Sequence, residues 1–474
     1  MLISALDTDR QRAIMARVRG RNASLAHTPL AYVDTYGCQQ NEADSEKLRG
    51  MLIEMGYSIN SGAPGSDVIV VNTCAVRDHA EKRALGNIGA LKHVKAARPG
   101  CVLAVCGCMP QRGAMADKLR ASYSYVDLVF GVHALWRFPE LLERALARRG
   151  RVFDAGGGDG AVAEGLPSAR GGGVKAWLPI MYGCDNYCSY CVVPYVRGRE
   201  RSREPGAVLA EARAIVGAGY KDITLLGQNV NSYGRALAPD TDFPELLRLV
   251  NGIDGDFIIR FMTSHPKDAG ERLFRAMAQC EKVARHIHLP FQAGSGRVLK
   301  AMNRGYTKHD YLGLIDMARG YMPDIVITSD VIVGFPGETR EDFNETVDVI
   351  KAVRFDALFT FIYSPREGTP AASMDDSVPR SEKQVWFDEL LSVQNAISSE
   401  RHSALVGAEL RVLVDGRDGD GSQILTGRTN GGRLVRISGA QDGDIGRFVR
   451  VKITSGATWS LSGEKRSDQQ SCRI

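Results

Sequence analysis

The chain contains 474 residues, of which 44% are hydrophobic and 24% are charged, a composition that excludes a disordered protein and a length that predicts about three domains. The formal net charge of +5 permits a nucleic-acid partner but does not by itself indicate one. Ten cysteines are too few for a disulfide scaffold in a chain of this length, and no apolar run approaches the roughly 18 residues that a membrane span requires.

The first segment, residues 1–28, is rich in arginine and contains no long apolar stretch followed by a small-residue cleavage site. Asp7 and Asp9 argue against an organelle transit peptide, so we interpret this segment as a solvated basic tail. We therefore expect a cytoplasmic protein whose thiols are reduced. In that setting, closely spaced cysteines indicate a metal site more readily than disulfide bonds.

Residues 29–148 alternate between short apolar runs and segments with helical spacing. The expected strands are "LAYVDTY", "DVIVVN", "CVLAV" and "DLVF", and the expected helices are "EADSEKLRGMLIEMG", "AEKRALGNIGALKHV" and "LWRFPELLERALARR". This alternation predicts a parallel α/β sheet. Residues 149–171 are rich in glycine and poor in bulky side chains, so we expect them to form a linker.

A second series of strands and helices occupies residues 172–402. Its expected strands are "DITLLG", "FIIRFM", "HIHLP", "IVITSDVIVGFPG" and "ALFTFIYSP". Several such repeats predict a full or partial TIM-like (β/α) barrel. Residues 403–467 instead contain short strands separated by glycine and aspartate turns, which predicts a small all-β barrel. Because its arginines alternate with apolar residues, one face of that barrel would be either basic or simply solvated.

The most specific pattern in the sequence is "GCDNYCSYC", which places Cys184, Cys188 and Cys191 within one loop. A structural zinc site normally has four protein ligands, and no fourth cysteine or histidine lies close in the sequence. Cysteines that only pack in a core would not usually crowd together with polar residues between them. An iron–sulfur cluster held by three thiolates fits best, and one of its irons would stay open to a further ligand.

Three more cysteines, Cys38, Cys74 and Cys108, each follow an apolar strand and precede a helix. Because the carboxyl ends of parallel strands meet along one edge of a sheet, these thiols could converge on a second cluster, again with three protein ligands. Cys106 competes with Cys108 for this role. The remaining cysteines have no partner pattern and are interpreted as structural or incidental: Cys101, Cys280 and Cys472.

The C-x3-C-x2-C loop resembles the motif of the radical S-adenosylmethionine (SAM) superfamily. Together with "TYGCQQN", "NTCAVRDHAEKR", "CGCMPQ", "LLGQNVNSYG", "HLPFQAGS" and "GFPGET", it is similar to the methylthiotransferases over residues 30–466. The resemblance implies a methylthiotransferase domain at 29–148, a radical SAM core at 172–402 and a TRAM barrel at 403–467. It also implies that Cys38, Cys74 and Cys108 hold an auxiliary cluster. Gln40 departs from the family pattern, which usually has methionine there, but it is no ligand.

The resemblance implies a transferase that adds a methylthio group to carbon 2 of N(6)-dimethylallyladenosine, at position 37 beside the anticodon of tRNA. It implies two 4Fe-4S clusters and two molecules of SAM per turnover. One SAM would methylate a sulfur on the auxiliary cluster, and the other would yield the radical that removes hydrogen from the nucleoside. A flavodoxin or ferredoxin is implied as electron donor, and we expect a monomer.

Two alternatives stay open at this point. A sister methylthiotransferase would act on threonylcarbamoyl-adenosine in tRNA or on a ribosomal protein, although "NTCAVR" and "LLGQNVNSYG" favour the prenylated adenosine. A protein of another class, a non-catalytic RNA-binding protein with zinc sites, would use the same cysteines without iron.

The resemblance also identifies candidate contacts to the cofactor. Tyr190 matches an aromatic residue that lies against the adenine of SAM, although a packing role fits it equally well. "DVIVGFPGE" resembles a strand-and-glycine element near that adenine, which points to Gly334 and Glu338. His265 and His288 follow or end expected strands and are interpreted as lining residues rather than ligands. No catalytic side chain is expected, because the cofactors carry the chemistry.

Several arginines are candidates for RNA contacts. One group alternates with other residues directly after the cysteine loop, where its members would meet RNA phosphates or the cofactor carboxylate, or form ion pairs in a solvated loop. A second group lies on the expected β-barrel, and the TRAM resemblance favours RNA binding there. The two groups are Arg197, Arg199, Arg201 and Arg203, and Arg428 and Arg436.

Overall fold

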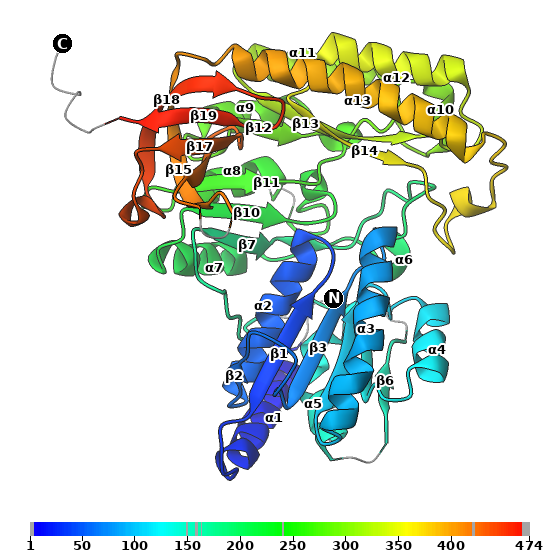
Figure 1. The fold of residues 1–474 in the computed structure, drawn as a ribbon, viewed down its shortest axis with the longest axis vertical. Helices are drawn as coiled ribbons and strands as arrows, with labels where there is room; N and C mark the ends of the chain where they lie inside the picture. Colours follow the sequence, from blue (N-terminus) through cyan, green and yellow to red (C-terminus); the bar gives the residue numbers. More distant parts are fainter. Residues whose placement is uncertain are drawn as a thin grey trace. The chain divides into compact units, whose positions relative to one another are not determined.

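The computed structural model describes residues 4–147, 150–156, 160–162, 164–238, 241–419 and 422–466. The chain divides into two compact units, whose helices and strands are drawn in Figure 1. The first unit contains Met1–Gly171, Met181–Tyr187 and Cys191–Arg203, and the second contains Gly172–Ile180, Cys188–Tyr190 and Glu204–Ile474. Cys472 lies outside the described residues.

The first helix, α1 (Ala5–Ala23), lies where the sequence predicted a solvated tail. Its residues Ile14, Met15 and Val18 are buried in the core of the first unit. The prediction for residues 1–28 was therefore wrong over this helix. These three apolar side chains share one side of the helix and pack in the core, which leaves the arginines to the other sides.

A parallel sheet of six strands forms the centre of the first unit, in the order β2-β1-β3-β4-β5-β6. The strands are β1 (Leu30–Thr35), β2 (Ser58–Ile59), β3 (Val68–Thr73), β4 (Val102–Gly107), β5 (Leu128–Gly131) and β6 (Val152–Asp154), and the helices are α2 (Gln39–Glu54), α3 (Asp78–Ala97), α4 (Gly113–Ser122) and α5 (Phe138–Leu146). All of β3 and β4 is buried, because a separate apolar cluster covers each face of the sheet. The predicted parallel α/β fold is confirmed.

The second unit contains a row of parallel strands. The strands are β7 (Lys175–Pro179), β10 (Asp222–Leu226), β11 (Ile258–Phe261), β12 (His286–His288), β13 (Val326–Val333) and β14 (Ala357–Ile362), and the helices are α7 (Pro205–Gly217), α8 (Phe243–Asn251), α9 (Glu271–Gln279), α10 (Gly296–Ala301), α11 (Lys308–Tyr321), α12 (Arg340–Val353) and α13 (Arg380–Ser403). Pairing runs β7-β10-β11 and β12-β13-β14, and a parallel bridge between Ile259 and Val283 joins the two groups. Within the described residues, β7 and β14 are not paired, so the predicted partial barrel is confirmed.

The last strands close into a barrel in the order β15-β16-β17-β19-β18. They are β15 (Glu409–Arg417), β16 (Leu425–Thr429), β17 (Leu434–Ser438), β18 (Phe448–Gly456) and β19 (Leu461–Lys465). Alternate residues such as Val412 and Val414 fill the interior, which confirms the predicted all-β barrel. The strand β19 pairs with both β17 and β18, so it closes the barrel and removes its edges.

The turn between β16 and β17 anchors this barrel to the partial barrel. Arg260 donates to the carbonyl oxygens of Thr429 and Asn430 at 3.0 and 2.6 Å and also to the Asp222 carboxylate at 2.8 Å. A Cβ at Gly431 would lie 2.3 Å from a methyl carbon of Val326, so only glycine permits this close approach. The turn therefore meets the partial barrel where its strands begin.

A buried carboxylate forms the second anchor. Asp356 precedes β14, and its Oδ1 accepts hydrogen bonds from Arg433 at 2.6 Å and from Arg401 at 2.8 Å. Burial acts to raise the pKa of Asp356, but Arg433 and Arg401 outweigh it and hold that pKa below its usual value. One carboxylate thus ties together α13, β14 and the small barrel.

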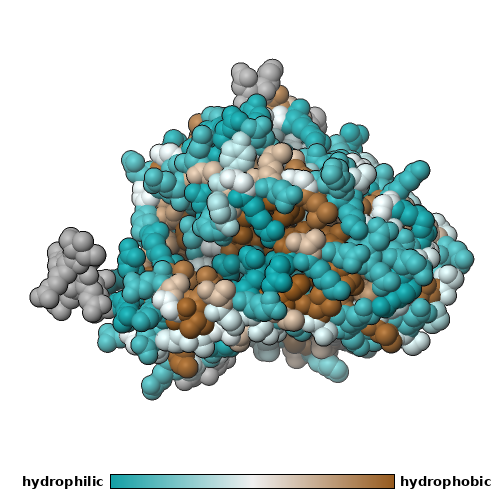
Figure 2. Space-filling model, turned by 90° about the horizontal axis from the view of Figure 1, so that it is seen from above, coloured by the Kyte–Doolittle hydropathy of each residue, from teal (hydrophilic) through white to brown (hydrophobic). Residues whose placement is uncertain are grey.

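No helix among the described residues is both long and apolar enough to cross a membrane. Figure 2 shows a face on which hydrophilic side chains surround a central group of apolar ones. Elsewhere in the described chain, some large apolar side chains stay exposed on helices, as at Met317 and Val385, and two lie on β14, at Phe359 and Phe361.

We expect Arg433→Met to lower the free energy of unfolding of the second unit by about 2–3 kcal/mol, because buried Asp356 loses one of its two guanidinium partners. Urea or thermal denaturation would show this as a lower midpoint. The matched control is Arg450→Met, the same change at an exposed residue of the same barrel, which should stay within about 0.5 kcal/mol of the parent. Equal effects of the two variants would contradict the anchoring role.

The same pair predicts a dependence of stability on pH. Because the folded-state pKa of Asp356 is depressed, the stabilisation is present above the unfolded-state value of 3.8 and is lost as the pH falls through the folded-state value. The difference in stability between the parent and Arg433→Met should therefore be full near neutral pH and shrink as the pH falls below 3.8. Denaturation midpoints measured across this range would check it.

Candidate functional site

Three cysteines lie at the carboxyl ends of neighbouring strands in the first unit. Cys74 and Cys108 directly follow β3 and β4, and Cys38 precedes α2 at the end of the loop after β1. The strands end level with one another, because the backbone N–H of Cys108 donates to the Thr73 carbonyl at 2.9 Å and that of Tyr36 to the Asn72 carbonyl at 2.8 Å. The structure thus brings the three predicted residues to one edge of one sheet, as parallel pairing requires.

Two glycines make this approach possible. Gly37 and Gly107 both have positive φ, +127° and +104°, a region that favours glycine. A Cβ on Gly37 would lie 2.4 Å from Cβ and 3.0 Å from Sγ of Cys74, and one on Gly107 would lie 2.3 Å from the Thr73 carbonyl oxygen. The glycine before Cys38 and the glycine before Cys108 are therefore each fixed by contact with the neighbouring strand end.

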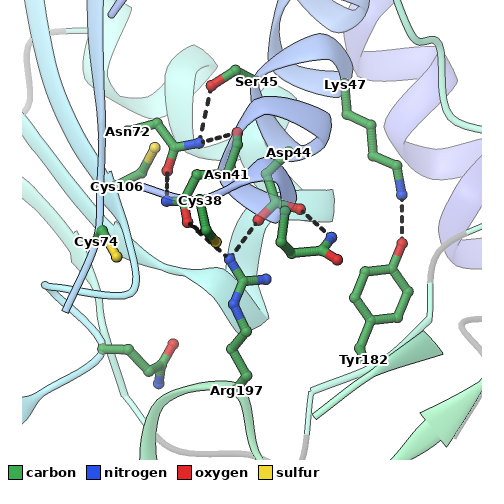
Figure 3. A network of polar contacts seen from close by, with 12 residues as sticks. Cys38, Asn41, Asp44, Ser45, Lys47, Asn72, Cys74, Cys106, Tyr182 and Arg197 are labelled. Atoms are coloured by element: carbon green, nitrogen blue, oxygen red, sulfur yellow. Dashed lines mark hydrogen bonds and ion pairs between the residues drawn. The ribbon is translucent and has the colours of Figure 1, made fainter. Parts of the chain in front are cut away.

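A network of amide side chains holds the loop of Cys38 against the end of β3 (Figure 3). The Cys38 thiol donates to Oδ1 of Asn41 at 3.3 Å, and Nδ2 of Asn41 donates to the Thr73 carbonyl at 2.9 Å. Asn72 donates in turn to the Asn41 carbonyl at 2.9 Å and to the Ser45 hydroxyl at 3.0 Å. Asn41 and Asn72 occur in the motifs read from the sequence, but sequence reasoning gave them no role.

Arg197 places a buried cation beside these cysteines. It ends helix α6 (Val193–Arg197) and donates to Oδ2 of Asp44 at 3.0 Å and to Oδ1 of Asn41 at 3.4 Å. Burial raises the pKa of the Cys108 thiol to about 12, while the Arg197 charge acts to lower it. The same pair of opposing effects acts on Cys74, whose pKa is also raised by burial. Arg197 therefore favours thiolates at a site where burial disfavours them.

Two of the arginines predicted to contact RNA are buried. Arg197 forms an ion pair with Asp44, and Arg203 donates twice to the Glu164 carboxylate, each time at 2.6 Å. Only 5% and 4% of these two arginines are exposed. Each guanidinium is enclosed beside a carboxylate, which gives both arginines a structural role. Their contact with RNA or with the cofactor carboxylate stays a prediction.

The other candidate arginines keep part of their surface exposed, although they form contacts within the protein. Arg199 donates to Asp185 at 2.8 Å, and Arg201 donates to the Arg197 carbonyl at 3.0 Å. On the small barrel, Arg436 donates to Asp418 at 2.6 Å, and Arg428 lies 3.7 Å from Asp415. Their contact with RNA stays a prediction.

Cys106, the competitor of Cys108, lies within β4 and is part of an apolar core cluster, in which it is fully buried. Burial raises its pKa well above the usual value. Cys108 belongs to a different cluster, with Ala75, Val192 and Val196. The structure thus gives Cys106 the environment of a packing residue.

The loop that carries Cys184, Cys188 and Cys191 follows strand β8 (Met181–Tyr182), which pairs with β9 (Arg201–Ser202). A Cβ on Gly183 would lie 2.0 Å from the Arg199 carbonyl oxygen, and the backbone N–H of Cys184 donates to the Gly198 carbonyl at 3.2 Å. Cys184 and Cys191 belong to the first unit and Cys188 to the second. None of the described cysteines forms a disulfide bond.

Arg304 lies beside Cys188 and was missed by sequence reasoning. It is buried and donates to Sγ of Cys188 at 3.3 Å, to the hydroxyls of Tyr190 and Tyr306 at 3.4 and 3.1 Å, and to the Pro290 carbonyl at 2.8 Å. Its position follows α10 in "MNRGYT", a segment without a ligand-like pattern, so no sequence signal would have found it. Tyr190 is half-buried and packs on an apolar cluster, so its predicted contact with the cofactor is not decided by this geometry.

Glu338 shapes the glycine turn after β13. Its carboxylate accepts hydrogen bonds from the backbone N–H groups of Gly334 and Phe335 at 2.5 and 3.1 Å. Burial raises the pKa of Glu338 to about 7, against the effect of these N–H groups. Only 2% of Glu338 is exposed, and its carboxylate holds the turn; its contact with the cofactor stays a prediction. Gly334 takes the positive φ, +70°, that this turn needs.

Buried polar atoms without a partner among the described residues gather after β10 and β11. They are Oδ1 of Asn229, both side-chain polar atoms of Asn231, Oγ of Ser264 and Nε2 of His265. Burial, and then the charge of Arg304, lowers the pKa of His265 to about 2, so its imidazole is neutral. Buried polar groups are normally satisfied, so this group fits a polar ligand at the carboxyl ends of the strands. His288 instead lies within reach of Thr328, at 3.0 Å.

Among the described residues, no three histidine, cysteine or acidic side chains lie as they would around a single metal ion. A structural zinc site needs such a tight tetrahedral set.

Comparison with known proteins agrees with this architecture. Residues 30–131 match the Uncharacterized protein family UPF0004, residues 178–350 the Radical SAM superfamily and residues 403–465 the TRAM domain. The chain is 51% identical over 434 residues to the "tRNA-2-methylthio-N(6)-dimethylallyladenosine synthase" of Acetivibrio thermocellus, which covers 92% of this chain and 90% of that protein. It is 48% identical to the protein of the same name from Clostridioides difficile, with 92% and 91% covered.

Among solved structures, the chain resembles the radical S-adenosylmethionine methyltransferase TsrM from Kitasatospora setae. The TM-score is 0.53 at 14% identity, with 73% of this chain and 77% of that chain covered. At this identity the likeness shows the fold alone.

The parallel sheet, the partial barrel and the closed β-barrel, with the matched families, define a radical SAM enzyme that carries a TRAM domain. The Radical SAM match implies a 4Fe-4S cluster and SAM as cofactors. At 51% identity over nearly its whole length, the chain belongs to the tRNA-2-methylthio-N(6)-dimethylallyladenosine synthase family of transferases.

On the prediction that Cys38, Cys74 and Cys108 hold a second cluster, we expect Arg197→Met to reduce the iron bound after anaerobic reconstitution from about eight to about four atoms per chain, because their thiolates would lose a buried cation. Iron and sulfide analysis would measure this. The matched control is Arg199→Met, the same change two residues away at a side chain that is 65% exposed. Full iron content in Arg197→Met, or an equal loss in both variants, would contradict the role of Arg197.

Proposed function

We propose that this chain is a radical SAM methylthiotransferase that adds a methylthio group to carbon 2 of N(6)-dimethylallyladenosine at position 37 of tRNA. The observation that carries the proposal is the identity of 51% with a synthase of that name, across 92% of the chain, in a protein that carries two separate sets of three cysteines. A transfer of sulfur to carbon needs both a radical source and a sulfur source, so two clusters suit it better than one.

In this proposal, Cys38, Cys74 and Cys108 hold the auxiliary cluster, and Cys184, Cys188 and Cys191 hold the radical SAM cluster. When bound, the clusters and two molecules of SAM per turnover would supply the radical and the methylthio group. The side chains around the first set orient and charge it. Asn41 fixes Cys38, and Arg197 stabilises thiolates that burial would otherwise protonate.

At the second set, Arg304 provides the corresponding positive charge and donates a hydrogen bond to Sγ of Cys188. Tyr190, which shares that guanidinium, lies on the same segment as Cys188 and is the proposed aromatic contact of SAM. The unpartnered polar atoms after β10 and β11 are suited to the polar groups of the cofactor. Gly334 stays a proposed cofactor contact, at a turn whose positive φ favours glycine.

The proposed substrate is the anticodon stem-loop of tRNA, bound in part by the small barrel and by the exposed parts of Arg199, Arg201, Arg428 and Arg436. An electron donor of low potential, such as flavodoxin or ferredoxin, would reduce the radical SAM cluster. We further propose that the protein acts as a monomer in the cytoplasm, where its cysteines stay reduced.

Two cysteine variants separate the two halves of the proposal. Cys184→Ala should abolish both 5′-deoxyadenosine and the methylthio product, because it removes the radical source. Cys38→Ala should abolish the methylthio product but retain 5′-deoxyadenosine, because only the sulfur source is damaged. Each variant should bind about four rather than about eight iron atoms. Nucleoside mass spectrometry of the tRNA measures the methylthio product, chromatography of the reaction mixture measures 5′-deoxyadenosine, and iron analysis measures the clusters.

The control is Cys280→Ala, a buried cysteine of the second unit outside both sets, which should keep its iron and its product. An unchanged methylthio product in Cys184→Ala would overturn the enzymatic proposal. A methylthio group found on threonylcarbamoyl-adenosine instead would move the chain to a sister activity, and a colourless protein with zinc would favour the non-catalytic alternative.

A further inference from the structure

The open side of the partial barrel exposes two aromatic side chains. β14 is the last strand of its row, and within the described residues nothing pairs with its free edge. Phe359 and Phe361 on this strand are 48% and 43% exposed. Large apolar side chains on an edge strand invite unwanted association, so a protein keeps them there only for a use.

The strand register places these rings on the inner face of the barrel. Phe359 pairs with Asp330 and Phe361 with Ile332, and paired residues of parallel strands point to the same face. The opposite face of these strands carries buried residues such as Val331 and Leu358, and α13 packs against it. Figure 1 shows α13 running beside β13 and β14. Because successive residues of a strand point to opposite faces, Phe359 and Phe361 face away from the side that carries Leu358, toward the barrel interior.

Polar groups stand beside the rings on that inner face. The His288 ring lies edge-on to Phe359, with 5.6 Å between ring centres, and its Nε2 is 3.4 Å from Oδ2 of Asp330. Asp330 keeps 29% of its side chain exposed. One rim of the aromatic surface therefore carries a carboxylate that can accept a hydrogen bond from a ligand N–H.

The surface is continuous with the segment that carries Cys188. Ile332, the register partner of Phe361, packs on the apolar cluster on which Tyr190 also packs. A ligand lying on Phe359 and Phe361 would thus be held inside the second unit, on the same wall as the proposed contact of SAM.

We propose that Phe359 and Phe361 form a stacking platform for the prenylated adenine once it is extruded from the RNA. The inference rests on the proposed function, since it takes that base as its occupant. Aromatic side chains stack on every base, and an enzyme that acts on a base interior to RNA must take it out of the stack. The substituted N6 atom keeps one N–H, which donates a hydrogen bond to the Asp330 carboxylate. The dimethylallyl group adds apolar surface that contacts Phe361 and Ile332.

The test measures binding of an anticodon stem-loop to the reconstituted holoenzyme by fluorescence anisotropy. One RNA carries N(6)-dimethylallyladenosine at the target position, and a second is abasic there. The parent should prefer the first RNA. The double variant Phe359→Ala/Phe361→Ala should bind the prenylated RNA about 10- to 100-fold more weakly and the abasic RNA as the parent does, with unchanged iron content.

Two further variants control the result. Phe359→Tyr/Phe361→Tyr keeps the ring faces and should restore the preference, and Met317→Ala, an exposed apolar residue of α11, should leave both affinities unchanged. The single alanine variants carry the same test if the double variant does not fold. Equal loss of affinity for both RNAs, or a full preference in the double variant, overturns the platform.

The outcome separates this inference from the proposed function. If the parent forms the methylthio nucleoside and the alanine variants keep the preference for the prenylated RNA, the stacking platform is wrong but the proposed function stands. If the parent prefers the prenylated RNA but forms no methylthio nucleoside, the proposed function is wrong and Phe359 and Phe361 remain a base-binding surface.

Discussion

The level alignment of three parallel strand ends is the constraint on which the first unit depends. The backbone bonds from Cys108 to Thr73 and from Tyr36 to Asn72 set the ends of β4, β3 and β1 side by side. Gly37 and Gly107 then let Cys38 and Cys108 lie close to the neighbouring strand end without a Cβ in the way. Any slip in this register would separate the thiols, so the sheet core and the proposed cluster site depend on the same strand pairing.

Both units place a buried guanidinium beside cysteine. Arg197 acts on Cys74 and Cys108, and Arg304 donates to Cys188. A cluster held by thiolates brings several negative charges into a medium that solvates them poorly, and a fixed cation offsets that penalty. Arg304 donates to a thiol, two phenol oxygens and a carbonyl, none of which is a carboxylate. The positive charge of Arg304 can therefore stabilise a thiolate at Cys188.

The parallel folds were predictable because β3 and β4 are continuous apolar runs, which only a sheet covered on both faces buries. The placement of Cys38, Cys74 and Cys108 at one edge of the sheet was predictable because each follows such a run. Helix α1 was missed because its few apolar residues become decisive only against the core. The buried positions of Arg197 and Arg304 beside cysteines could not be predicted, since a sequence does not show which arginines a fold will enclose. Asn41 and Asn72 lie in the recognised motifs, but their role follows only from contact with the neighbouring strand end.

The anchored turn at Asn430 and Gly431 gives the second unit a fixed geometry. Arg260, Arg433 and Asp356 lock the small barrel onto the start of the neighbouring strands, so it is no freely swinging appendage. If the small barrel binds RNA as proposed, this rigid connection would act as a molecular ruler. It would select a nucleotide by its distance along a folded RNA, without any need to recognise the bases in between.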